Sequence, residues 1–123
     1  MPASKTTRVI IVDDQDVVRR GLSVFLDAFE DFELVGEASN GAEAVALCDT
    51  LLPDIVLMDI YMPQMDGLTA TQKIRQRHPE IRIIVLTSLK DDEILSRMMH
   101  AGAVNYILKD ASIDELAAAI RKA

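Results

Sequence analysis

The sequence predicts an α/β fold, a doubly wound parallel sheet of five strands in the order 2-1-3-4-5 with five helices. Three observations indicate it. Five short apolar runs alternate with five stretches of helical apolar spacing along the 123 residues. The runs are almost continuously apolar, which is typical of parallel strands covered on both faces. The segments between them are short, as expected for right-handed crossovers between parallel strands.

The predicted strands are rich in Val and Ile, whose branched side chains favour extended backbone. In chain order they read RVIIV, ELVGEA, DIVLMD, IRIIVLTS and NYILK, at residues 8–12, 33–38, 54–59, 81–88 and 105–109. Residues 1–7 form a polar lead-in. The remaining residues, 8–123, are predicted to be one domain, because the sequence contains no repeat, linker or low-complexity tract.

Helices are predicted between these strands, because apolar residues recur there every three or four positions. In chain order the apolar sets are Val18, Leu22, Phe25 and Phe29; Ala44, Val45, Cys48, Leu51 and Leu52; Ala70 and Ile74; Ile94, Leu95, Met98 and Met99; and Ile113, Leu116, Ala117 and Ile120. The third helix spans 68–78, and the fourth spans 91–101. Taken singly, Met98 and Met99 are interpreted as ordinary core residues.

Local start and stop signals support these helices. Asn40 and Ser112 are each followed three residues later by Glu, the pattern of a side-chain N-cap. Gly102 follows the fourth helix and favours a left-handed C-cap. Pro79 ends the third helix, since proline cannot continue a helix.

Composition excludes several classes of function. The net charge is −7 without a basic block, which argues against binding nucleic acid through phosphates. The single cysteine, Cys48, excludes an internal disulfide and a multi-cysteine zinc site, and its helical spacing predicts a core position. No apolar run has the length of a membrane span or the form of a signal peptide. A cytoplasmic protein is therefore expected.

Polar residues follow four of the five predicted strands at their carboxyl ends, where open α/β sheets bind ligands. Asp13 and Asp14 follow the first strand, Asp59 ends the third, Thr87 ends the fourth and Lys109 ends the fifth. In the order 2-1-3-4-5 the first and third strands are neighbours. The three acids are therefore predicted to cluster at one edge of the sheet.

Clustered carboxylates repel one another, and a bound cation relieves that repulsion. Oxygen ligands favour Mg²⁺, or Mn²⁺ as an alternative. Lys109 would add a point charge for a phosphoryl oxygen and Thr87 a hydrogen bond, so Asp59 is the candidate nucleophile. Singly, each residue has an ordinary interpretation, such as Asp13 and Asp14 capping the next helix. The hypothesis depends on their convergence.

Four motifs resemble the signatures of the response-regulator receiver domain of bacterial two-component signalling, the CheY-like family: VDDQ at 12–15, MDIYMPQMDG at 58–67, LTS at 86–88 and YILK at 106–109. The resemblance covers nearly the whole chain and implies the doubly wound fold, Mg²⁺ and phosphotransfer from a histidine kinase. It implies the following roles: phosphoacceptor, Asp59; metal ligands, Asp13, Asp14, Asp59 and the backbone carbonyl of Tyr61; phosphoryl contacts, Thr87 and Lys109; switch residues, Thr87 and Tyr106.

The stretches VVRRGLSVFL, LTSLKDD and YILKDAS are similar to the NarL/FixJ subclass. This likeness implies a C-terminal LuxR-type helix-turn-helix domain in a longer parent, so DNA binding is expected of that domain and not of this chain. Asp110 follows Lys109, where many receivers have proline. A cis bond would be costly without proline, which leaves the geometry of the Lys109–Asp110 bond open.

The resemblance also implies a mechanism of switching. Thr87 is expected to move toward the added phosphoryl group and Tyr106 to rotate inward, changing the face of the helix at 91–101 and promoting dimerisation or effector release. Tyr61 and Leu89 are expected to flank the site and to affect water access. The chain is expected to phosphorylate and dephosphorylate only itself, and so not to be an enzyme.

Three alternatives have different requirements. A dehalogenase-type phosphatase needs a second acid two residues after the nucleophile, where this chain has Tyr61. A flavodoxin-like module needs a Ser/Thr/Gly-rich phosphate loop after the first strand, where acids would repel phosphate. A pseudo-receiver that acts by protein contact alone should lack a site residue, and none is missing here.

Overall fold

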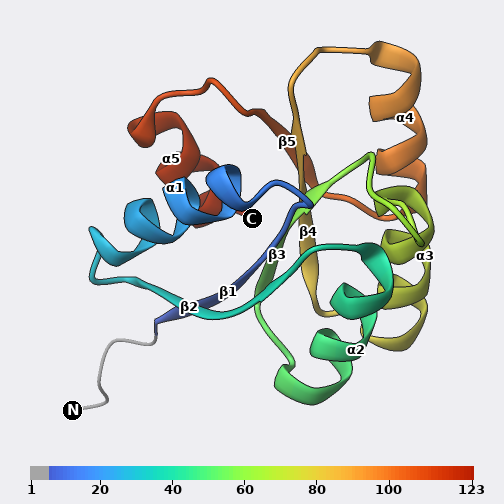
Figure 1. Ribbon diagram of the computed structural model, residues 1–123, viewed down its shortest axis with the longest axis horizontal. Coiled ribbons are helices and arrows are strands. Elements are labelled where there is room, and N and C mark those ends of the chain that lie inside the picture. The colour runs from blue at the N-terminus through green and yellow to red at the C-terminus, as the bar shows by residue number, and fades with distance from the viewer. Residues whose placement is uncertain (1–5) are drawn as a thin grey trace.

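The computed structural model describes residues 6–123, and ten elements alternate strictly along them (Figure 1). The strands are β1 (Thr7–Val12), β2 (Phe32–Ala38), β3 (Ile55–Asp59), β4 (Arg82–Thr87) and β5 (Asn105–Leu108). The helices are α1 (Asp16–Asp27), α2 (Gly41–Leu51), α3 (Gly67–Arg77), α4 (Asp92–Ala101) and α5 (Ile113–Lys122). The predicted lead-in falls mostly outside the described residues, and Thr7 already belongs to β1.

The strands form one parallel sheet in the order β2-β1-β3-β4-β5, as the sequence predicts. Helices α1 and α5 cover one face, and α2, α3 and α4 cover the other (Figure 1). All five residues of β3 are buried, because β3 lies between β1 and β4 under helices on both faces. No helix within residues 6–123 is both long and apolar enough to cross a membrane.

Two apolar cores fill the layers. One contains Ile10, Val56, Met58 and Val85 from the strands and lies against α2, α3 and α4; the other contains Val9, Ile11, Leu57 and Leu86 and lies against α1 and α5. This alternation follows from the strand period of two, which directs successive side chains to opposite faces. Cys48 and Met98 lie in the first core, as predicted. Met99 is 43% exposed, so its assignment to the core was wrong.

The predicted caps are confirmed. The Glu43 amide donates to the Asn40 side chain over 2.9 Å, and Ser112 forms a reciprocal capping box with Glu115. Gly102 ends α4 with φ of 120°, a backbone conformation that favours glycine. Helix α1 ends at Asp27, before the predicted Phe29, which instead packs against Phe25 and Phe32.

Candidate functional site

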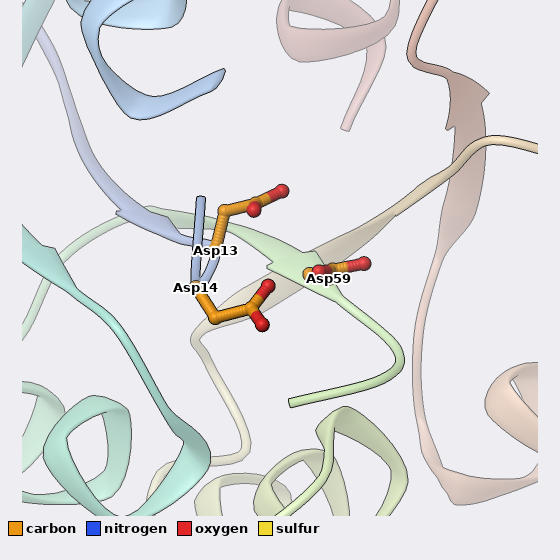
Figure 2. Close-up of side chains that lie close together, drawn as sticks. All are labelled: Asp13, Asp14 and Asp59. Carbon is orange, nitrogen blue, oxygen red and sulfur yellow. The ribbon is translucent and has the colours of Figure 1, made fainter. Parts of the chain in front are cut away.

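Three acids meet where β1 and β3 end. Asp13 and Asp14 directly follow β1, and Asp59 is the last residue of the neighbouring strand β3. One carboxylate oxygen from each lies within 4.8 Å of the others, and Figure 2 shows the three side chains gathered there. The predicted cluster is therefore present, and it exists because parallel strands place their carboxyl ends on the same edge of the sheet.

Asp13 is fully buried and held at several atoms. Its amide donates to the carbonyl of Ala38 over 3.0 Å, and its Oδ1 accepts from the amide of Gln15 over 2.9 Å. Its buried Oδ2 lies 2.8 Å from Nζ of Lys109 and forms an ion pair with it. The capping interpretation is wrong, because the N-cap of α1 is Gln15 and no side chain caps the helix. Asp13 instead fixes the turn before α1 with one oxygen, while the other faces the cluster.

Lys109 supplies the positive charge of the cluster. It follows β5, and its amide donates to the carbonyl of Thr87 over 2.8 Å, which anchors the start of the β5–α5 loop. Its Nζ lies 2.8 Å from Asp13 Oδ2 and 3.4 Å from Asp59 Oδ1. Burial alone would lower the pKa of Lys109, but the two carboxylates outweigh burial and leave that pKa raised. The ammonium therefore remains charged.

The pKa of Asp59 is raised, because the effects that disfavour its charged form outweigh those that favour it. Burial comes first and the negative charge of Asp13 second, and these outweigh the stabilising effect of Lys109. The residue is only 7% exposed, although it stands at the end of its strand, and the Ile60 amide donates to its Oδ1 over 2.8 Å. The cluster of acids thus disfavours the ionised form of Asp59 when no cation is present.

The hydroxyl of Thr87 is directed into its own loop. It donates to the backbone carbonyl of Leu89 over 2.8 Å, so it is not hydrogen-bonded to any of the acids. Tyr106 is half-buried and packs against the core on the α4 side. It is paired with Val85, two residues before Thr87, so the strand period places Tyr106 and Thr87 on the same face of neighbouring strands.

The loop after β3 approaches the site closely through a glycine. The Gly67 amide donates to the carbonyl of Ile60 over 2.7 Å, and a Cβ at residue 67 would lie 2.0 Å from the carbonyl oxygen of Asp59. The Asp66 side chain accepts from the Thr69 amide and caps α3. Helix α3 therefore begins in direct contact with the strand end that carries Asp59, which only glycine permits.

An open pocket of about 330 Å³ lies over this edge. It is lined by Asp14, Gln15, Asp59, Ile60, Tyr61, Thr87, Ser88, Leu89 and Lys109. Tyr61 and Leu89, which line it, are 68% and 77% exposed. The groups that could bind a metal are three carboxylates whose oxygens lie close together, so the site fits a hard divalent cation.

One residue at this edge, Arg19, is not among those that the sequence motifs indicate. Arg19, on α1, donates from Nη1 to the backbone carbonyl of Asp13 over 2.5 Å. The sequence signal was its spacing of three residues from Asp16, which permits a helical ion pair. The contact with Asp13 depends on the turn between β1 and α1, which spacing alone does not reveal.

The Lys109–Asp110 bond is trans, as are all peptide bonds of residues 6–123.

Comparisons with known proteins agree with this geometry. Residues 9–121 match the family model of the response regulator receiver domain. The transcriptional regulatory protein LiaR of Bacillus subtilis is 47% identical over 116 residues, and the response regulator protein VraR of Staphylococcus aureus is 43% identical over 117. The matches cover 94% and 95% of this chain. They cover 55% and 56% of those relatives, so the chain spans about half their length.

A solved structure supports the same comparison. The crystal structure of a DNA-binding response regulator of the LuxR family from Staphylococcus aureus superposes with a TM-score of 0.88 at 33% identity. The superposition covers 94% of this chain and 97% of that one.

Proposed function

The chain belongs to the family of response-regulator receiver domains, and from that membership we propose that Asp59 accepts a phosphoryl group from the phosphohistidine of a sensor histidine kinase. The observation that carries the proposal is the convergence of three carboxylates within 4.8 Å, with the Lys109 ammonium 3.4 Å from Asp59. Carboxylates form acyl phosphates, and phosphoryl transfer depends mainly on position and charge.

In the proposed step, a carboxylate oxygen of Asp59 forms a bond to phosphorus as the bond from phosphorus to the histidine nitrogen breaks. The electron pair of that bond remains with the imidazole, which takes a proton from solvent. Lys109 offsets the charge of the phosphoryl oxygens. Mg²⁺, or Mn²⁺, would be held by Asp13, Asp14, Asp59 and the Tyr61 backbone carbonyl, and would add positive charge beside those oxygens.

The Thr87 hydroxyl is the proposed first element of the switch. Its hydrogen bond to the carbonyl of Leu89 would be exchanged for one to a phosphoryl oxygen, which is a stronger acceptor because it is charged. Movement of Thr87 would open space on the face of the sheet that it shares with Tyr106. Rotation of Tyr106 into that space would alter the surface of α4 and β5, and so shift a two-state equilibrium.

The likeness to LiaR, VraR and a LuxR-family regulator supports a place in transcription control. We infer a longer parent whose C-terminal helix-turn-helix domain binds DNA, with dimerisation on phosphorylation as the output. The domain is proposed to be a signalling module rather than an enzyme, since the acyl phosphate forms and hydrolyses on its own chain. A cytoplasmic location is part of the same proposal.

One experiment tests the phosphoacceptor. The purified chain is incubated with Mg²⁺ and acetyl phosphate and then weighed by intact mass spectrometry, beside Asp59→Asn. One added phosphoryl group on the wild type and none on the variant is the expected result. No adduct, together with no change of the thermal melt in beryllofluoride, would contradict the proposal and favour a pseudo-receiver that signals by contact alone.

A further inference from the structure

Arg19 is the most extensively bonded cation at the edge of the sheet where Asp13, Asp14 and Asp59 lie, although it is not one of the family's signature residues. Its side chain is only 17% exposed, and its guanidinium extends in three directions. Nη1 donates to the carbonyl of Asp13 over 2.5 Å, Nη2 pairs with Asp16 of the same helix, and Nε lies 3.5 Å from Glu37 on β2. The guanidinium therefore joins the β1–α1 turn, α1 and β2.

The carbonyl that Arg19 holds belongs to the peptide group between Asp13 and Asp14. The other polar groups of Asp13 already have partners, since its amide binds Ala38 and its Oδ1 binds Gln15. The carbonyl is held by Arg19. Because a peptide group is planar, fixing this oxygen also fixes the direction in which the chain enters Asp14.

Asp14 needs such support because its own side chain has little. It is exposed, and no hydrogen bond or ion pair to any of residues 6–123 holds its carboxylate. Asp13 and Asp59, by contrast, are buried and each accepts a backbone hydrogen bond. The aim of the Asp14 carboxylate therefore depends on the backbone that carries it.

We propose that Arg19 is a positioning residue for the divalent-cation site. By fixing the Asp13–Asp14 peptide plane, it aims the Asp14 carboxylate at the point that the carboxylates of Asp13 and Asp59 share. The proposal rests on the proposed function, because the cation is the one used in phosphorylation of Asp59. It adds a residue on α1 to a site whose other protein groups come from the ends of the strands.

The charge of Arg19 makes the test discriminating. A positive charge near a cation site opposes cation binding, so loss of that charge alone should tighten Mg²⁺ binding. Loss of the positioning contact should weaken it. Arg19→Lys keeps the charge but replaces a planar fork by a single ammonium, which cannot maintain all three contacts. Arg19→Met removes both the charge and the contacts. Comparison of Arg19→Lys with Arg19→Met therefore separates the effect of position from the effect of charge.

The experiment measures Mg²⁺ dissociation constants by isothermal titration calorimetry for the wild type, Arg19→Lys, Arg19→Met, Asp14→Asn and Arg20→Met. Arg20 is the matched control, since it is the exposed neighbour and its side chain makes no hydrogen bond or ion pair with the described residues. We expect the dissociation constant to rise about tenfold in both Arg19 variants, at the lower end of effects from groups that orient ligands. Arg20→Met should leave it unchanged or slightly lower.

A second readout separates positioning from damage to the fold. With acetyl phosphate as donor, Arg19→Lys should need about tenfold more Mg²⁺ for half-maximal phosphorylation, in line with its binding loss, but reach the wild-type rate at saturating Mg²⁺. A lower maximal rate with unchanged half-saturation would indicate a merely structural role and overturn the proposal. Wild-type Mg²⁺ affinity in Arg19→Lys, or tighter binding in Arg19→Met, would also overturn it.

Failure of the proposed function would look different. If the wild type bound no Mg²⁺, or if Asp14→Asn bound it as tightly as the wild type, the cation site itself would be wrong and both proposals would fall. If the wild type bound Mg²⁺ through Asp14 while both Arg19 variants matched it, only the role of Arg19 would be refuted.

Discussion

The ammonium of Lys109 lies 2.8 Å from Oδ2 of Asp13, which is closer than its distance of 3.4 Å from Asp59. The lysine therefore neutralises the fully buried acid first and leaves Asp59 only partly compensated. This asymmetry agrees with the raised pKa of Asp59, whose main causes are burial and the charge of Asp13. Burial and the charge of Asp13 thus make the ionised form of Asp59 less stable than in solution until a cation binds.

Asp59→Asn should stabilise the metal-free protein. A raised folded-state pKa means that the unfolded chain releases the Asp59 proton first, so folding stability falls as pH rises above the ordinary value of 3.8 and through the folded-state pKa. Asparagine does not ionise, so the stability of the variant should not fall with pH for this reason. The variant should therefore melt at a higher temperature than the wild type near neutral pH. Thermal melts across pH, with chelator present, measure the difference.

The control for this effect is Glu80→Gln, which removes one exposed acid far from the cluster and should leave the melt nearly unchanged. Mg²⁺ at ten times its dissociation constant should stabilise the wild type by about 1.4 kcal/mol through linkage. A metal-free Asp59→Asn protein that melted lower than the wild type would refute the argument from repulsion and burial.

Gly67→Ala and Gly21→Ala should have opposite effects on stability. A Cβ at Gly67 would overlap the carbonyl oxygen of Asp59 at 2.0 Å, so α3 or β3 must shift, at a cost of about 2 kcal/mol or more. A Cβ at Gly21 meets nothing within 4 Å, and alanine in a helix interior gains about 0.5–1 kcal/mol over glycine. Urea denaturation gives both values.

The same pair tests whether the contact matters for function. Gly67→Ala should also slow phosphorylation by acetyl phosphate, because the strand end that carries Asp59 must move, whereas Gly21→Ala should phosphorylate like the wild type. Equal stability of the two variants would show that the start of α3 can move without cost.

Thr71→Val should stabilise the fold by about 1 kcal/mol, because a buried hydroxyl loses its hydrogen bonds to water and here gains none from the protein. Thr71 lies on α3 and is fully buried, and its Oγ1 has no hydrogen-bond partner among the described residues. Valine has nearly the same shape. Thr71→Ser keeps the hydroxyl but loses a methyl group, so it should be less stable than the wild type. Chemical denaturation would rank the three proteins, and a less stable Thr71→Val would reveal a partner for the hydroxyl.

Arg121 joins α5 to the turn before β2, and its removal should lower stability in a salt- and pH-dependent way. Its guanidinium makes two bonds to Asp31, at 2.8 and 3.1 Å, and lies 5.2 and 5.3 Å from the ring centroids of Phe29 and Phe32. The bond from Arg121 holds the pKa of Asp31 below 3.8, so this stabilisation is complete above that pH and is lost as pH falls through the folded-state pKa.

Arg121→Lys and Arg121→Met would separate the charge from the planar fork in thermal melts near neutral pH. We expect both variants to melt at a lower temperature than the wild type. Lysine should lower the melting temperature less than methionine, because it keeps the charge. Lysine still loses the two hydrogen bonds of the planar guanidinium and its stacking on the rings. Salt should narrow the difference between wild type and the methionine variant. Lysine equal to arginine would mean that the rings contribute nothing.

The sequence predicts those parts of the site that depend on topology or on local caps. Asp13, Asp59 and Lys109 converge because strand order and strand ends alone bring them together. The caps at Asn40 and Ser112 depend on neighbours within three residues. Both kinds of information are present in the pattern of residue types, so the fold and most of the cluster could be predicted.

Other features depend on geometry that no spacing encodes. The Thr87 hydroxyl donates to the carbonyl of Leu89, and the position of that carbonyl depends on the path of the loop. Met99 has helical apolar spacing but lies outside the narrower stripe that α4 buries. The contact of Arg19 with Asp13 joins a side chain to a backbone atom, and backbone atoms carry no residue-type signal.

The complete burial of β3 has a consequence for the timescales on which different parts of the molecule open. Amide hydrogens of a strand enclosed by two neighbours and two helical layers exchange with solvent mainly on global unfolding, whereas exposed loop amides exchange through local opening. The segment at 88–91, after β4, is exposed throughout. Asp59 therefore stands at the end of a strand that is expected to open only on global unfolding, and it shares a pocket with a loop that is expected to open locally. A single phosphoryl group can shift only conformations that differ little in free energy, and those of the loop are of this kind.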